Sequence, residues 1–205
     1  GQAEAALAET RSELDEIRQL LETQRAEVAA LSDEAAREEE AAQLTARRAL
    51  QRAALTRIQT ALDSGTGYSD ALGDLRDTDL EVPQALVEQA DSGVMTLPAL
   101  QTAFPDAARS ALRAARQDAG STGISGFLQT QLGVRSLEPR EGDDPDAVLS
   151  RAEAALREGR LADALAEVQS LSGAPQAEMA EWQGQAETRL ATVAAAQDLA
   201  QTLNA

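Results

Sequence analysis

The feature that most constrains this chain is the stretch from Ala3 to Leu62, which contains neither proline nor glycine. These two residues interrupt helices more strongly than any others. Within the stretch, leucine or a smaller apolar residue recurs every seven positions, a spacing that places the side chains along one side of a helix. The members of this repeat are Leu7, Leu14, Leu21 and Val28, continued by Ala35 and Ala42. The pattern predicts one long helix of the coiled-coil type.

Companion positions three residues later strengthen the first part of this repeat. Ile17 and Leu31 are apolar there, whereas Gln24 is polar and Glu38 is charged, so the repeat holds over about four heptads and then decays. We therefore assign residues 1–42 to a coiled coil. Only 2% of the chain is aromatic and its apolar share is mostly alanine and leucine, so a single copy can bury little apolar area. We expect a homo-oligomer with the seam Leu7, Leu14, Ile17, Leu21, Val28 and Leu31.

The charge of the helix reverses after Glu40. The segment Gln43–Leu62 carries four arginines and no acidic residue, inside a chain of net charge −17. A helical projection places most of its large apolar side chains in one sector, which predicts a basic amphipathic helix over residues 43–62. Three interpretations fit: packing on the following domain, docking to a partner helix, or binding to an anionic membrane. The lipid-binding candidates are Arg47, Arg48, Arg52, Arg57, Leu44, Leu50, Leu55, Ile58 and Leu62.

A helical domain follows over residues 63–205. Asp63–Gly67 predicts a helix stop and a turn, and Pro105 predicts the start of a new helix. Asp144 followed by Pro145 predicts an N-cap and a first helical residue. The helices expected from these signals span 68–76, 83–91, 96–103, 105–119, 124–133, 146–158, 161–171 and 175–203. The fold class is therefore all-α, a long coiled-coil helix followed by a small helical-bundle domain.

The residue types present exclude most catalytic chemistry. The chain has no histidine and no cysteine, which removes the usual zinc, haem and iron–sulfur ligands and the common catalytic triads. We expect no enzyme activity, no cofactor and no metal. The acidic balance argues against a nucleic-acid partner. The few large side chains are predicted to be core anchors or an exposed docking surface: Tyr68, Phe104, Phe127 and Trp182.

Several short motifs, taken in order, resemble the soluble part of the mitofilin family in its bacterial form. The first is Ala61–Tyr68 with Leu72 and Leu75, and the second is Ala90–Val94 with Leu100 and Phe104-Pro105. Further along the chain come Phe127-Leu128, Gly133–Arg135, Ala152–Leu156 with Gly159, Leu161, Ala164-Leu165, and Trp182. The resemblance covers essentially the whole chain.

The resemblance implies a membrane-shaping scaffold that holds curved membrane in invaginations or contact sites. It implies self-assembly through the coiled coil and the domain, and anionic lipid binding by the segment before the domain, here Gln43–Leu62. It also implies an anchor in the bacterial inner membrane, which we expect to precede Gly1, with this part in the periplasm. Other membrane proteins, including outer-membrane proteins, are expected partners.

The alternative is a helical adaptor that binds protein partners without lipid. The pattern Ala154-Ala-Leu with Gly159, Leu161 and Ala164-Leu165 is typical of one tetratricopeptide-type hairpin, although stable arrays need about three such repeats. Membrane-anchored accessory proteins of haem biosynthesis operons have a similar architecture.

Overall fold

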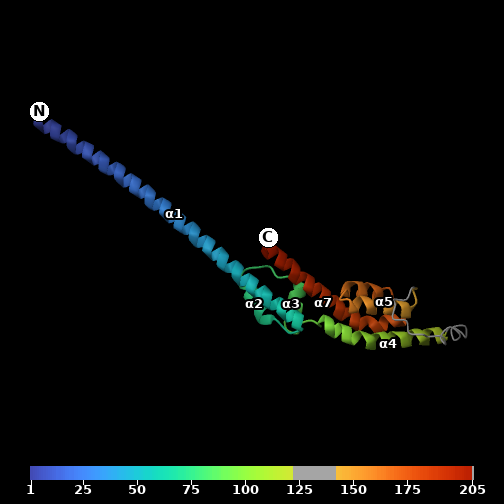
Figure 1. Cartoon of the computed structure of the whole chain (residues 1–205). Coiled ribbons are helices and arrows are strands. Elements are labelled where there is room, and N and C mark those ends of the chain that lie inside the picture. Colours follow the sequence, from blue (N-terminus) through green and yellow to red (C-terminus); the bar gives the residue numbers. More distant parts are fainter. Residues whose placement is uncertain (122–141, 205) are drawn as a thin grey trace. The chain divides into compact units, whose positions relative to one another are not determined.

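The computed structural model describes residues 1–121 and 142–204, and this part of the chain contains seven helices and no strand (Figure 1). The all-α prediction is confirmed, including the long first helix. The helices are α1 (Gln2–Ser64), α2 (Ser69–Arg76), α3 (Gln84–Glu88), α4 (Leu97–Ser121), α5 (Pro145–Arg157), α6 (Leu161–Gln169) and α7 (Ala174–Asn204). The helix expected over 124–133, with Phe127, lies outside the described residues.

Contacts divide the chain into two units, Gly1–Ala49 and Leu50–Ala205. The first unit is the part of α1 up to Ala49, and every one of its side chains is exposed. The second unit contains the end of α1 and the six other helices. Tertiary packing supplies most of the stability of helices in globular proteins, and the side chains of this unit have none within residues 1–121 and 142–204.

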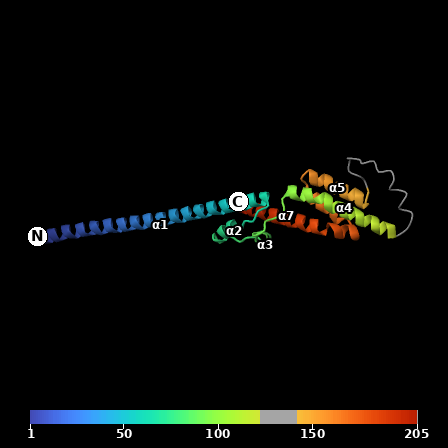
Figure 2. The same ribbon diagram turned by 90° about the horizontal axis from the view of Figure 1, so that it is seen from below.

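Two clusters of buried side chains form the core of the second unit. One joins the end of α1 to α2, α3 and the last turns of α7, through residues such as Ile58, Leu75, Leu86 and Leu199. The other joins α4, α5, α6 and the first half of α7 around Phe104 and Trp182. Figure 2 shows α7 running past α4 and α5. Because α7 contributes to both clusters, we expect them to unfold together.

The structure corrects the predicted break at Pro105. Two helices, 96–103 and 105–119, were expected there, whereas α4 continues from Leu97 to Ser121 with Pro105 inside it. Proline removes one backbone hydrogen bond and normally costs about 3 kcal/mol in a helix interior. Here Leu100, Phe104 and Ala111, on both sides of the proline, are buried in one core cluster. Tertiary packing of one continuous apolar face therefore outweighs the local preference.

Most of the other predicted helix ends lie within a few residues of the observed ones. Asp144 caps α5, because its carboxylate accepts hydrogen bonds from the backbone N–H groups of Asp146 and Ala147, each at 3.1 Å. Thr96 caps α4 by accepting from the N–H of Ala99 at 3.2 Å. The exception is α3, which ends at Glu88 and not at residue 91.

Two loops that carry the resemblance motifs pack on each other through their backbones. The N–H of Tyr68 donates to the carbonyl of Ala90 at 2.6 Å. A Cβ at Gly67 would lie 2.3 Å from the carbonyl oxygen of Asp91, and one at Gly93 would lie 2.5 Å from that of Thr66. Gly93 also has a φ of +70°, which side chains disfavour. Both glycines are therefore required where the loop after α1 meets the loop after α3.

Candidate functional site

The predicted seam residues form an exposed apolar row in the first unit. Their exposed fractions run from 46% at Leu21 to 66% at Val28. Exposed large apolar residues are common singly on protein surfaces, but a row at heptad spacing is typical of an unpaired coiled-coil face. The members of the row are Leu7, Leu14, Ile17, Leu21, Val28 and Leu31.

The structure divides the basic segment 43–62 into two parts with different surroundings. In the first part, Leu44 is 52% exposed and Leu50 is 63% exposed. Arg47 and Arg48 are also exposed, and their side chains make no hydrogen bond or ion pair within residues 1–121 and 142–204. This first part has the residue types and the accessibility that contact with an anionic surface requires.

In the second part, the apolar side chains belong to the domain core. Leu55, Ile58 and Leu62 are buried, with exposed fractions of 5%, 0% and 2%. They pack in the cluster that includes Leu72 and Leu199. In this structure they are inaccessible to lipid, so the nine lipid-binding candidates do not form one surface.

The two arginines of the second part are engaged in the same unit. Arg57 forms an ion pair with Asp74 of α2, and Arg52 donates to the carbonyl oxygen of Leu203 in α7 at 3.3 Å. Both side chains remain largely exposed, so each contact contributes little stability, about 0–1 kcal/mol. Their geometry shows that this part of α1 belongs to the domain.

Buried and partly buried polar contacts that the sequence does not reveal hold the end of α1 in the domain. The Gln51 amide donates to the Thr78 hydroxyl at 3.1 Å, and that hydroxyl donates to the Leu75 carbonyl at 2.6 Å. Arg189 of α7 donates to the Leu62 carbonyl at 3.1 Å and also to the carbonyl of Met95. A guanidinium at a helix C-terminus also compensates the negative end of the helix dipole. No local sequence signal pairs residues so far apart.

The three described aromatic residues of the predicted set all lie in the core. The ring centroids of Phe104 and Trp182 are 5.0 Å apart at an interplanar angle of 76°, and the indole N–H donates to the Leu100 carbonyl at 3.1 Å. The Tyr68 hydroxyl donates to the Leu86 carbonyl at 2.8 Å, and burial raises the pKa of Tyr68 to about 12. These side chains anchor helices rather than offering a docking surface in this structure.

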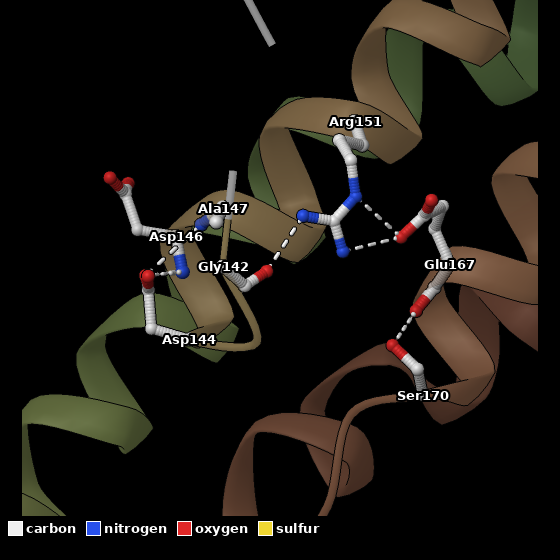
Figure 3. A network of polar contacts seen from close by, with 7 residues as sticks. All are labelled: Gly142, Asp144, Asp146, Ala147, Arg151, Glu167 and Ser170. Carbon is white, nitrogen blue, oxygen red and sulfur yellow. Dashed lines mark hydrogen bonds and ion pairs between the residues drawn. The ribbon is translucent and has the colours of Figure 1, made fainter. Parts of the chain in front are cut away.

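Helices α5 and α6 form the hairpin that the sequence pattern indicated, and a polar network holds it (Figure 3). The Arg151 guanidinium donates to the Glu167 carboxylate at 3.0 and 2.8 Å, and to the Gly142 carbonyl at 2.7 Å. Its hydrogen bond to Glu167 raises the pKa of Arg151 above the ordinary value. The network therefore ties the segment before α5 and α5 itself to α6.

Within 1–121 and 142–204, no group of three or more histidine, cysteine or acidic side chains could hold a metal ion. In the same residues, no helix is long and apolar enough to cross a bilayer.

Comparison with known proteins gave one match. The family model described as "Mitofilin: Mitochondrial inner membrane protein" matches residues 89–203, which is more than half of the chain. No curated protein and no solved structure matches the chain. The matched region begins inside the loop that packs on Gly67 and extends to the end of α7, so it includes all of α4, α5 and α6.

Proposed function

Because the chain belongs to the mitofilin family, a family of membrane-associated proteins, we propose that it is a non-enzymatic membrane-shaping scaffold. In this proposal, copies assemble through the seam in residues 1–42 and through the helical domain. Anionic lipid binds to the exposed first part of the basic segment. Together the two contacts support membrane curvature in invaginations or at contact sites.

The observation that carries the proposal is the exposed row from Leu7 to Leu31. Six large apolar side chains, each roughly half exposed, stand at heptad spacing on the first part of α1, where every side chain is exposed. Burying the exposed part of each would contribute about 1 kcal/mol before entropic costs. Assembly through this row would bury an apolar face that is exposed in a single copy, and packing of such a face supplies most of the stability of helices in proteins.

Lipid binding is assigned to Arg47 and Arg48, with Leu44 and Leu50 beside them. Each arginine near an anionic surface contributes about 1 kcal/mol, so two arginines bind weakly in a single copy. Assembly along the seam would present several such segments at once, and avidity would then make binding effective. The proposed location is the bacterial inner membrane, with this part in the periplasm and other membrane proteins as partners.

Vesicle sedimentation tests the lipid contact. The chain should co-sediment with vesicles that contain an anionic phospholipid at low salt, and less so at high salt, because screening weakens surface attraction. Replacing Arg47→Glu and Arg48→Glu should abolish sedimentation. The matched control is Arg11→Glu with Arg37→Glu, which makes the same charge change at exposed positions of the same helix. Equal losses in the two variants would show that only net charge matters and would contradict the assignment.

Light scattering tests the seam with two neighbouring leucines. Leu21→Asp places a charge in the exposed row, whereas Leu20→Asp places the same charge one position outside it. The proposal expects the first variant to have the lower mass. If both variants had the mass of the unchanged chain, self-association would not depend on the seam.

A second candidate function, a helical adaptor, is favoured by the α5–α6 hairpin. Two helices, α5 and α6, joined by a short turn at Gly159 (φ +81°), have the helix–turn–helix form of one tetratricopeptide-type unit. An adaptor that never contacts lipid would remain in the supernatant in the vesicle experiment at every salt concentration.

A further inference from the structure

A groove of about 570 Å³ lies in the second unit, between the extended segment before α3 and the last turns of α7. Its apolar lining comes from Leu80, Val82, Pro83 and Leu199. This volume is within the range of about 300–1,000 Å³ that is typical of pockets for bound groups. The groove can therefore accommodate side chains of another molecule.

The rim of the groove is acidic. Glu81 and Asp198 line it, and no arginine does. Both carboxylates are exposed, and neither forms a hydrogen bond or ion pair within residues 1–121 and 142–204. In the same described residues, the backbone groups of Leu80, Glu81 and Val82 make no hydrogen bonds. A groove with an apolar floor and unpaired carboxylates fits an occupant that combines apolar and cationic side chains.

The chain itself contains such a surface. Leu44, Arg47 and Arg48 stand at positions i, i+3 and i+4 of α1, so they share one side of the helix within about 100°. The leucine is exposed between two arginines that have no side-chain partner in the described residues. The occupant and the groove are thus complementary in both polarity and charge.

We propose that this groove binds the Leu44–Arg48 surface of a second copy of the chain. Leu44 of one copy contacts the apolar floor, and Arg47 and Arg48 pair with Glu81 and Asp198 of the other. The contact links the helix of one copy to the domain of its neighbour. It goes beyond seam assembly and lipid binding. It uses the same side chains as the proposed lipid contact, so one copy makes either contact but not both at once. Because it forms without lipid, it stands even if vesicle sedimentation fails.

Disulfide cross-linking of the full chain tests the contact directly, because the chain has no cysteine of its own. A chain with Thr45→Cys is mixed with a differently tagged chain carrying Gln84→Cys at the groove, and the mixture is oxidised without lipid. We expect a disulfide-linked heterodimer. The control pairs Thr45→Cys with Glu153→Cys, an exposed position on α5. A yield no greater than that of the control would overturn the proposal.

A charge exchange tests the assigned ion pairs. Arg47→Glu and Arg48→Glu in the Thr45→Cys chain should lower the cross-link yield about tenfold, since two attractions become repulsions. Glu81→Arg and Asp198→Arg in the Gln84→Cys chain should then restore it. A yield unchanged by the first exchange, or not restored by the second, would contradict the pairing. All four positions are exposed, so these variants keep the buried core intact.

Discussion

Replacing Ile58→Ala tests whether the second part of the basic segment is domain core. Ile58 is 0% exposed and packs in the cluster that includes Leu75 and Leu86. The change removes three buried carbons, which at about 0.8 kcal/mol each gives roughly 2.4 kcal/mol of lost transfer free energy. The cavity that remains adds to this loss, so we expect the free energy of unfolding to fall by about 3–4 kcal/mol. For a unit of this size the melting temperature should fall by about 6–16 °C.

The assay is urea unfolding followed by the fluorescence of Tyr68 and Trp182, which report on different core clusters. Leu44→Ala is the control, because it removes the same number of carbons from an exposed side chain and should cost less than about 0.5 kcal/mol. Both probes should report the same transition, since α7 contributes to both clusters. A loss below about 1 kcal/mol for Ile58→Ala would refute the core assignment.

Three further predictions concern the same unit. Burial raises the pKa of Tyr68 to about 12, so between about pH 10 and 12 the tyrosine keeps its proton in the folded state and loses it in the unfolded state. The free energy of unfolding should therefore fall as pH rises over this range. Tyr68→Phe should remove that pH dependence in urea titrations. Gly67→Ala should lower the free energy of unfolding by about 1–3 kcal/mol in the same assay, because the added Cβ would overlap the Asp91 carbonyl. Gly73→Ala has open space around it and should stabilise helix α2 by about 0.5–1 kcal/mol. Arg189→Met should lower the free energy of unfolding by about 1–3 kcal/mol, because the backbone carbonyls of Leu62 and Met95 lose their hydrogen-bond donor.

The sequence predicts most of the helices because their signals are local. The proline-free stretch defines α1, and the pair Asp144-Pro145 marks the start of α5, since a cap and a first-turn proline act within one turn. The helix break predicted at Pro105 was wrong. Phe104 and Ala111, on either side of the proline in α4, pack in a core cluster with other helices, and that stabilisation comes from residues far along the chain.

The sequence predicts the candidate site less well than it predicts the helices. An apolar stripe beside arginines can pack on lipid, on a partner helix or on its own domain, and the helical projection is the same in each case. The structure shows that Ile58 packs on the domain while Leu44 stays exposed. That division depends on Thr78 and Leu199, whose positions beside α1 follow from the fold of the whole unit.

The most direct test of the proposed function is electron microscopy of anionic vesicles incubated with the chain. A scaffold that both assembles and binds lipid should convert round vesicles into tubules or invaginated forms. Leu21→Asp should leave the vesicles round, although some protein still binds to them. Arg47→Glu with Arg48→Glu should leave the vesicles round and without bound protein. Vesicles that stay round with the unchanged chain, at a concentration where it co-sediments with them, would contradict the claim that this protein shapes membranes.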